Sequence, residues 1–185
     1  GRVKLPSTRP LPPAVDLAIE AFPSIGPSDA AITVVEFADF SCSLCRGVSG
    51  VMHELLAEHP HTLRWVFVHF PVAKKGVGRH IHAGGQCLME QQLFWAYHDL
   101  VFERMVDINA QDAPQLAAEV GADMTRFDAC YAGKTGEWAV RRGLELGRKH
   151  RVTRTPTLFV NGRPFASSQL KKDLGALNEN TTTGL

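Results

Sequence analysis

The sequence predicts an α/β fold in which a central mixed sheet, flanked by helices, is interrupted by an inserted helical domain. A strand, a helix and a second strand follow one another between residues 31 and 70. Helical periodicity then dominates residues 74–152, and strand signals return at "TPTLFVNGRPFA". We therefore expect the sheet domain to comprise residues 27–73 and 153–185, with the helical insert at 74–152 between them.

The first strand is expected in "AITVVEFADF", residues 31–40, which is rich in the β-branched and aromatic residues that suit a buried strand. Apolar residues then recur at helical spacing from Cys42 to Leu56, and "EHPH" ends the pattern. The stretch "TLRWVFVHF" predicts a second strand that Pro71 closes. A strand, a helix and a strand in this order favour a parallel pair joined by a right-handed crossover.

The two ends of the chain carry weaker signals. Residues 1–26 are expected to form a linker and an irregular lead-in, because the prolines of "LPSTRPLPPA" favour extended polyproline geometry. The insert is expected to hold four or five helical segments. Beyond it, Asn161-Gly162 predicts a tight hairpin turn, and "SSQLKKDLGALNEN" predicts a short final helix before a polar tail.

Length and charge narrow the range of functions. A chain of 185 residues with 44% hydrophobic content can bury one main core. Lys and Arg total 20 against 19 Asp and Glu, so no strong field attracts nucleic acid, and we expect no nucleic-acid partner. No run approaches the roughly 18 apolar residues of a membrane span, and the first residues lack the apolar core of a signal peptide.

Cys42 and Cys45 form a Cys-x-x-Cys pair at the first turn of the expected helix. Free N–H groups and the positive end of the helix dipole favour a thiolate at Cys42, which makes it the better nucleophile. Cys45 lies one turn further on and can attack a mixed disulfide on Cys42. Ser43 and Leu44 lie between the two cysteines and are candidates for contact with a substrate.

Two other chemistries compete with a redox pair. A structural zinc usually takes four ligands, and this motif supplies two with no second Cys-x-x-Cys in the chain. His80 and His82 are two residues apart, so on a helix they face different directions, and we expect no metal. An inert disulfide is the other alternative, although the order of strand, Cys-x-x-Cys helix and strand favours the redox function.

Glu36 is an acidic residue within an otherwise apolar strand, six residues before Cys42. An exposed edge position would explain it, but a central parallel strand has both faces covered, so we expect the carboxyl group to be buried. Burial raises the pKa of a carboxyl group and suits it to accept or donate a proton near neutral pH. We predict that Glu36 is the proton shuttle for Cys45, with Asp39 as the weaker candidate.

Pro156 stands at the mouth of the returning strand, where a trans proline would disturb strand pairing. A cis bond between Thr155 and Pro156 would avoid this. We expect the cis proline to pack against the cysteine pair. The backbone of Thr155 would then offer an edge to which an extended substrate peptide can add as a strand.

These motifs, together with "QLFWAYHDLVF" in the helical insert, resemble the thioredoxin superfamily and specifically its DsbA-like branch, over roughly residues 27–177. The resemblance implies a thioredoxin fold with a helical insertion and thiol–disulfide exchange outside the cytoplasm. It also implies that Cys42 attacks, Cys45 resolves, Glu36 is the buried acid and Pro156 is the cis proline. Ser43-Leu44 replaces the Pro-His of strongly oxidising members, and Thr155 replaces a valine, so we expect a less oxidising centre and leave the choice of partner open.

Cys87 and Cys130 remain, both on apolar faces of expected insert helices. Free buried cysteines are common in proteins. The resemblance places the chain in an oxidising compartment, and relatives of this type have similar cysteines. We therefore expect a structural disulfide between Cys87 and Cys130.

The function expected from the sequence is extracytoplasmic thiol–disulfide exchange between the Cys42–Cys45 disulfide and cysteines of secreted proteins, in the oxidising direction. We expect a monomer with no cofactor besides this disulfide. Its partners would be reduced or misoxidised secreted proteins and a membrane redox partner. We expect a periplasmic or membrane-tethered, outward-facing domain whose signal or anchor is absent from this chain. Alternatives are a disulfide reductase or isomerase, or a redox-inactive binding or chaperone domain.

Overall fold

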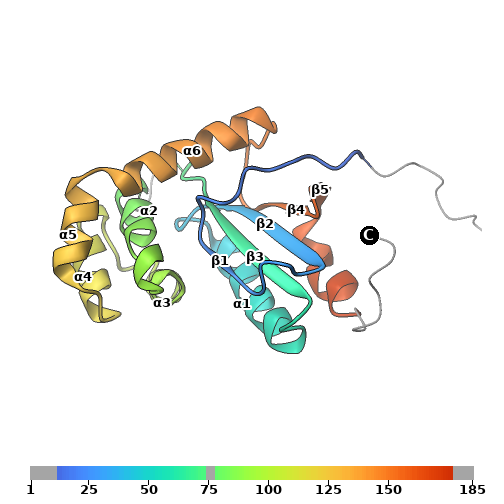
Figure 1. Cartoon of the computed structure of the whole chain (residues 1–185), viewed down its shortest axis with the longest axis horizontal. Coiled ribbons are helices and arrows are strands. Elements are labelled where there is room, and N and C mark those ends of the chain that lie inside the picture. Colours follow the sequence, from blue (N-terminus) through green and yellow to red (C-terminus); the bar gives the residue numbers. More distant parts are fainter. Residues whose placement is uncertain (1–11, 74–77, 177–185) are drawn as a thin grey trace, which may run out of the picture.

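The computed structural model describes residues 12–73 and 78–176 (Figure 1). Most of the expected proline-rich linker, the first four residues of the expected insert, and the end of the final helix with its polar tail lie outside these ranges.

Within the described residues, a mixed five-stranded sheet forms the centre of the fold, in the order β1-β3-β2-β4-β5. Its strands are β1 (Ser24–Ile25), β2 (Ile32–Ala38), β3 (Leu63–His69), β4 (Thr157–Val160) and β5 (Arg163–Phe165). β2 and β3 are parallel, as their sequence order predicts, and the other neighbours are antiparallel. The predicted α/β fold class is confirmed. The lead-in differs from the expectation because β1, only two residues long, is too short to show strand alternation.

The helix α1 (Ser43–Glu58) connects β2 to β3. Five α-helices lie between β3 and β4 in the described chain: α2 (Gly78–Cys87), α3 (Phe94–Glu103), α4 (Ala113–Glu119), α5 (Met124–Ala132) and α6 (Thr135–Lys149). α2 and α3 are separated by a 3-10 turn at Met89–Gln91 and by Gln92 in the left-handed conformation, where the sequence suggests one long helical run. Residues 167–174 form a 3-10 turn and a π-helical turn instead of the expected α-helix.

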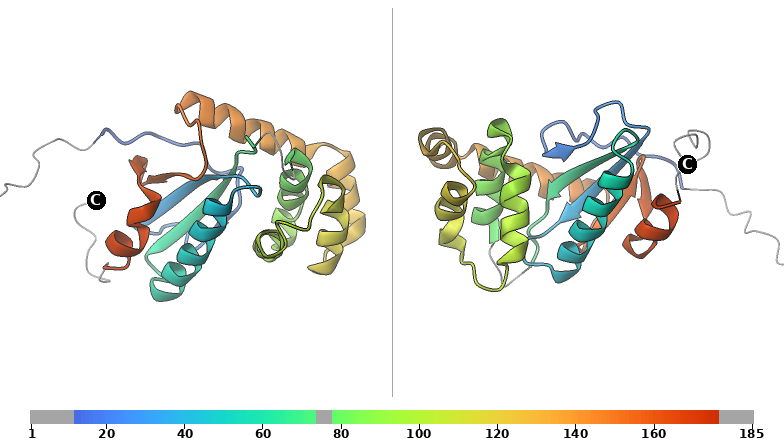
Figure 2. Two further views of the ribbon diagram at one scale, coloured as in Figure 1. Left: turned by 180° about the vertical axis from the view of Figure 1, so that it is seen from behind. Right: turned by 90° about the horizontal axis from the view of Figure 1, so that it is seen from below.

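The helices form layers on both faces of the sheet (Figure 2). α1 and the C-terminal helical turns pack on the face that carries Val34 and Trp65. α6 and the lead-in pack on the opposite face, which carries Val35 and Phe37. Side chains alternate along β2, so Glu36 shares the α1 face with Val34.

Glycines let α6 lie directly against its neighbours. A Cβ atom at Gly136 would overlap the carbonyl oxygen of Ala83, and one at Gly143 would overlap that of His69. A Cβ atom at Gly147 would overlap a ring carbon of Phe70. α6 therefore contacts α2 and the end of β3 at backbone distance, and it joins the insert to the sheet (Figure 1).

A disulfide joins Cys87, the last residue of α2, to Cys130 in α5. We expect the variant Cys87→Ala/Cys130→Ala to lose up to about 4 kcal/mol of unfolding free energy, because the crosslink spans 43 residues of the unfolded chain. Urea unfolding of the oxidised proteins measures the difference. Reduced wild-type protein should unfold close to the double variant. Equal stability of the variant and the oxidised wild type would contradict a stabilising role for the bridge.

Candidate active site

Cys42 is the N-cap residue of α1, and its sulfur accepts a hydrogen bond of 3.3 Å from the backbone N–H of Cys45. β2 leads directly into this position, and the N–H of Cys42 donates to the carbonyl of Asp39 at 3.0 Å. Cys42 is half-buried, whereas Cys45 is fully buried beneath it. The geometry gives only Cys42 access to a substrate, with helix N–H groups available to a thiolate.

The loop before β4 faces Cys42. β4 pairs antiparallel with β2, so Thr157 lies beside Phe37 and the residues before it lie at the end of β2. The peptide bond between Thr155 and Pro156 is cis. Cys42 Sγ lies 3.6 Å from the carbonyl oxygen of Thr155 and donates to it. The structure thus brings Cys42 next to Thr155 and Pro156, which follow it in sequence by 113 residues or more.

Glu36 is buried on the α1 face of the sheet, with 1% of its surface exposed. Burial raises its pKa to about 8, even though a hydrogen bond from Trp65 lowers it. Trp65 Nε1 donates to Glu36 Oε2 at 2.9 Å, and Oε1 has no hydrogen-bond partner in the described chain. The unpartnered oxygen of Glu36 is therefore able to carry the proton.

Cys45 is electrostatically linked to this carboxyl group. Burial, followed by the charge on Glu36, raises the pKa of Cys45 far above its ordinary value. A free thiolate at Cys45 is therefore costly, and any step that forms or consumes it needs a proton donor or acceptor nearby. Glu36, with a pKa of about 8, suits that exchange near neutral pH.

Trp65 is a residue of the site that the sequence did not indicate. We expect Trp65→Phe to raise the pKa of Glu36 above about 8, because the variant loses the one side-chain hydrogen bond that lowers it. A carboxyl titration followed by ¹³C NMR of labelled glutamate measures this value. An unchanged or lower midpoint would contradict the assignment of that hydrogen bond.

Asp39, the weaker candidate for the proton shuttle of Cys45, has a structural role instead. Its carboxylate accepts hydrogen bonds of 2.9 Å from the backbone N–H groups of Ser41, Val72 and Ala73. Burial alone would raise the pKa of Asp39, but His82 at 3.5 Å and the backbone donors lower it to about 2. Asp39 is therefore a fixed anion that ties the chain after β3 to the start of α1.

Two buried histidines continue this network, and their role also escaped the sequence. The N–H of Phe40 donates to His82 Nε2 at 3.1 Å, a shorter contact than that of His82 with Asp39. In the neutral imidazole the lone pair is therefore on Nε2. His82 Nδ1 lies 3.0 Å from Nδ1 of His69, and Nε2 of His69 lies 2.9 Å from Gln86 Oε1.

These hydrogen bonds determine which ring nitrogen of each histidine carries the proton. His82 donates from Nδ1 to His69, and His69 donates from Nε2 to Gln86. Burial lowers the pKa of both imidazoles, so both are neutral. These contacts join residues 13 to 42 positions apart, and no sequence pattern predicts them. A polar residue at the end of an apolar strand, such as His69, does indicate a buried polar contact.

Ser43 and Leu44 are exposed at the first turn of α1, and Leu44 has 69% of its surface accessible. Val72, which Asp39 ties to the same region, is 42% exposed. Apolar side chains are therefore accessible next to Cys42 and can contact an unfolded polypeptide.

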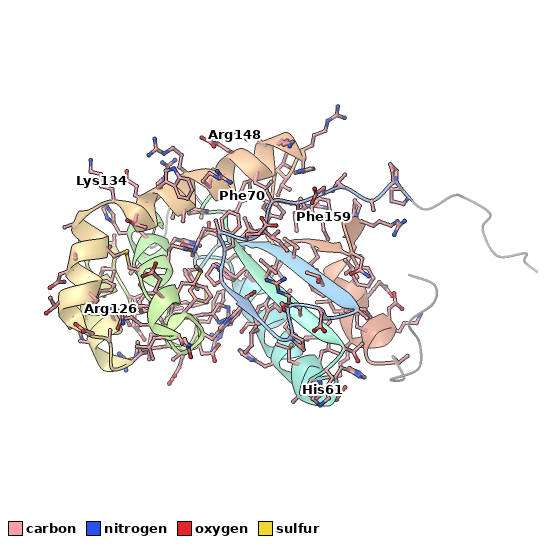
Figure 3. All side chains as sticks on the ribbon, in the orientation of Figure 1. His61, Phe70, Arg126, Lys134, Arg148 and Phe159 are labelled. Carbon is pink, nitrogen blue, oxygen red and sulfur yellow. A yellow bond between two sulfur atoms is a disulfide. The ribbon has the colours of Figure 1, made fainter. Side chains whose placement is uncertain are left out.

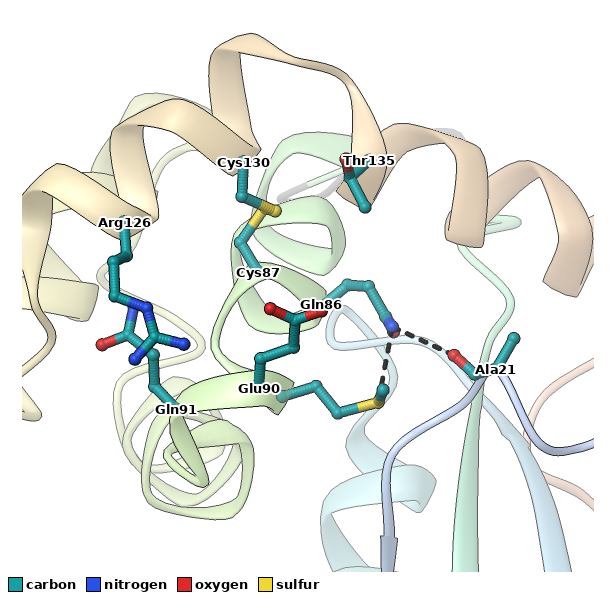
Figure 4. A pocket seen from close by; sticks show the side chains of 9 residues that line it. Ala21, Gln86, Cys87, Glu90, Gln91, Arg126, Cys130 and Thr135 are labelled. Atoms are coloured by element: carbon teal, nitrogen blue, oxygen red, sulfur yellow. Dashed lines mark hydrogen bonds between the residues drawn. A yellow bond between two sulfur atoms is a disulfide. The ribbon is translucent and has the colours of Figure 1, made fainter.

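The pocket in Figure 4 lies apart from Cys42, and its lining includes neither cysteine of the Cys-x-x-Cys pair nor Thr155 or Pro156. Its wall contains the disulfide, together with Ala21, Gln86, Glu90, Gln91, Arg126 and Thr135. Gln86 donates from this wall to the carbonyl of Ala21 at 3.0 Å. That contact holds the lead-in against α2.

A mixed sheet with a helical insertion, and a Cys-x-x-Cys helix facing a cis proline, define a protein of the thioredoxin fold in its DsbA-like form. The chain belongs to the thioredoxin family, because the model of the family described as "Thioredoxin" matches residues 20–179. The resemblance to the thioredoxin superfamily drawn from the sequence is confirmed. A fold and a site of this kind support thiol–disulfide exchange.

Solved structures agree on the fold. Oxidised BdbD from Bacillus subtilis superposes with a TM-score of 0.74 at 19% identity, over 88% of this chain and 95% of BdbD. The thiol-disulfide exchange protein α-DsbA2 from Wolbachia pipientis has a TM-score of 0.73 at 16% identity, over 86% of this chain and 88% of its own.

Curated relatives are longer proteins. A Na(+)/H(+) antiporter NhaA from Herminiimonas arsenicoxydans is 31% identical over 94% of this chain and 27% of the relative. NhaA 3 from Salinispora tropica is 31% identical over 75% of this chain and 21% of the relative. The chain thus spans about a quarter of these relatives or less. In the chain itself, none of the helices within the described residues is long and apolar enough to cross a membrane.

Proposed function

We propose that the protein is an extracytoplasmic thiol–disulfide oxidoreductase that oxidises cysteines of secreted proteins, with the Cys42–Cys45 disulfide as its only redox group. The observation that supports it most is the placement of Cys42 Sγ. It lies at the N-terminus of α1, 3.6 Å from the Thr155 carbonyl, and the buried Cys45 lies one helical turn behind it.

The oxidising cycle begins with the disulfide form. A substrate thiolate attacks Cys42 Sγ, the Cys42–Cys45 bond breaks, and its electron pair leaves on Cys45. Protonated Glu36 gives its proton to Cys45, since burial makes a thiolate there unfavourable. A second substrate thiolate then attacks the substrate sulfur of the mixed disulfide. The substrate leaves oxidised, and Cys42 leaves as a thiolate that receives helix N–H hydrogen bonds.

The substrate is expected to bind as an extended peptide along the edge formed by Thr155 and Pro156, with Ser43 and Leu44 as further contacts. A membrane redox partner would return the dithiol to the disulfide. We place the protein in the periplasm or on an outward-facing membrane tether, and as a monomer. In support, one solved neighbour, at TM-score 0.65, is described as a periplasmic thioredoxin-like protein from Salmonella enterica.

A glutathione redox titration of the Cys42–Cys45 pair tests the proposal. We expect reversible oxidation with a potential more negative than the value of about −120 mV of the strongly oxidising DsbA, because Ser43-Leu44 offers no histidine cation to the Cys42 thiolate. A potential at or above that value would contradict the tuning argument. A pair that does not equilibrate with glutathione would favour a redox-inactive binding domain.

A further inference from the structure

Three side chains at the junction of α1 and α3, away from the cysteine pair, lie close enough to bind one cation. They are His53 on α1, and His98 and Asp99 on α3. His53 Nε2 and His98 Nδ1 each lie 2.8 Å from the same oxygen, Asp99 Oδ1. All three potential ligand atoms lie within 4.8 Å of one another.

We propose that His53, His98 and Asp99 form a binding site for a divalent late first-row transition ion, represented here by Zn²⁺. The site joins the Cys-x-x-Cys helix to the helical insert. Two imidazoles and a carboxylate suit zinc, and three protein ligands leave the fourth tetrahedral position to water.

Two of the three distances between ligand atoms require only small movements, and the third, between the two imidazole nitrogens within 4.8 Å of each other, must reach the same spacing. Zinc holds nitrogen and oxygen ligands at about 2.0 to 2.2 Å, so two ligands of a tetrahedral ion lie roughly 3.3 Å apart. Each nitrogen–oxygen pair must therefore open by about half an ångström from 2.8 Å. The side chains of His53 and Asp99 are 37% and 50% exposed and are free to make this change.

His98 supplies the fixed ligand. Its side chain is fully buried, and its ring packs against the nearly perpendicular rings of Trp65, Phe67 and Phe102, with centroids 4.9 to 5.2 Å away. This packing holds Nδ1 toward Asp99. His98 Nε2 has no hydrogen-bond partner in the described chain, so coordination through Nδ1 breaks no hydrogen bond at the buried end of the ring. The ring proton moves to Nε2, and the imidazole stays neutral.

Without an ion, the same atoms form a hydrogen-bonded bridge in which both histidines donate to Asp99. This bridge is the competing explanation. The two explanations differ in what they predict for added metal, because a hydrogen-bonded bridge alone takes up no ion.

Zinc titration of the tag-free, fully oxidised protein tests the site. Oxidation blocks Cys42 and Cys45, whose thiolates would otherwise bind Zn²⁺. We expect one Zn²⁺ per chain in competition with a chromophoric chelator. His53→Ala and Asp99→Asn should each lower the affinity more than about tenfold, the smallest loss typical even of outer-shell partners. His61→Ala is the matched control, because His61 is exposed in the loop after α1 and should leave the affinity unchanged (Figure 3).

Two further readouts report on geometry and position. Co²⁺ in place of Zn²⁺ should give the visible absorption bands of a four-coordinate ion in the wild type and lose them in His53→Ala. Zn²⁺ should also raise the unfolding temperature of the wild type, and not that of Asp99→Asn, because it links α1 to α3 only when bound. Absence of a one-to-one complex at micromolar Zn²⁺ would overturn the proposal, as would equal affinity in wild type and His53→Ala.

Discussion

Cys45→Ser should accumulate as a mixed disulfide between Cys42 and its substrate, with loss of turnover. When this variant meets a disulfide-bonded substrate, the Cys42 thiolate attacks one substrate sulfur and the other substrate sulfur leaves as a thiolate. The serine cannot attack the resulting mixed disulfide, so the release of the partner by Cys45 is removed. Cys42 keeps its half-exposed position at the N-cap of α1 and still reacts. Non-reducing electrophoresis followed by mass spectrometry of the trapped adduct measures the result.

Cys42→Ser is the matched variant and should form no adduct at all, because Cys45 is fully buried. Both variants should retain the Cys87–Cys130 disulfide and unfold cooperatively, which separates loss of chemistry from loss of fold. Adducts formed equally by the two variants would show that Cys42 is not the attacking residue. Absence of redox turnover in the wild type, with a binding or chaperone activity that is unchanged in Cys42→Ser, would favour the redox-inactive domain.

Glu36→Gln should slow opening of the Cys42–Cys45 disulfide roughly a hundredfold near neutral pH, the lower range of a general-acid contribution. The glutamine cannot give a proton to Cys45 as it leaves. In the wild type the rate, corrected for the thiolate fraction of the attacking thiol, should fall as Glu36 loses its proton near pH 8. Stopped-flow reduction across pH 6 to 10 measures both effects. A wild-type inflection that persists in the variant would assign it to another group.

The same substitution should change the pH dependence of stability. The carboxyl group of Glu36 has a pKa of about 8 in the folded protein against 4.5 ordinarily, so between these values the folded state holds the extra proton. Stability conferred by this group is complete below pH 4.5 and is lost as pH rises to 8, by up to about 5 kcal/mol.

The difference in unfolding free energy between Glu36→Gln and wild type should therefore change in favour of the variant over this window and be constant outside it. Urea unfolding at several pH values measures it. Glu103→Gln removes an exposed carboxylate at the end of α3 and is the matched control. A difference between Glu36→Gln and wild type that does not change with pH would contradict the raised pKa of the Glu36 carboxyl group.

The fold class was accessible from the sequence because its signals are local. β2, α1 and β3 each carry their own periodicity, and the Asn161-Gly162 turn gives both residues the positive φ that a tight hairpin needs. The break between α2 and α3 was not accessible. It depends on Gln92 adopting a left-handed conformation that its residue type does not favour.

The residues of the site likewise fall into those that the sequence predicts and those that it does not. Cys42 and Cys45 are defined by spacing, and Glu36 is conspicuous as an acid in an apolar strand. Trp65 is 29 residues from Glu36 in sequence, and its contact depends on the register of β2 and β3. His82 is 42 residues from Phe40 and 43 from Asp39, and its contacts depend on how α2 packs against the sheet. A register shift of one residue would turn Trp65 to the other face of the sheet, so no single-sequence pattern can assign its partner.

The contacts of the glycines in α6 also fix the length of the link between the helical insert and the loop before β4. α6 is 15 residues long, or about 22 Å, and five residues lie between its end at Lys149 and Thr155. Its rotation is set at Gly143 and Gly147 by contact with the end of β3. α6 therefore sets where the chain leaves the insert, and the pairing of β4 with β2 then places the Thr155 carbonyl beside Cys42. Inserting one residue in α6 would turn its two ends about 100° relative to each other, so it would misalign the site while leaving every residue of that site unchanged.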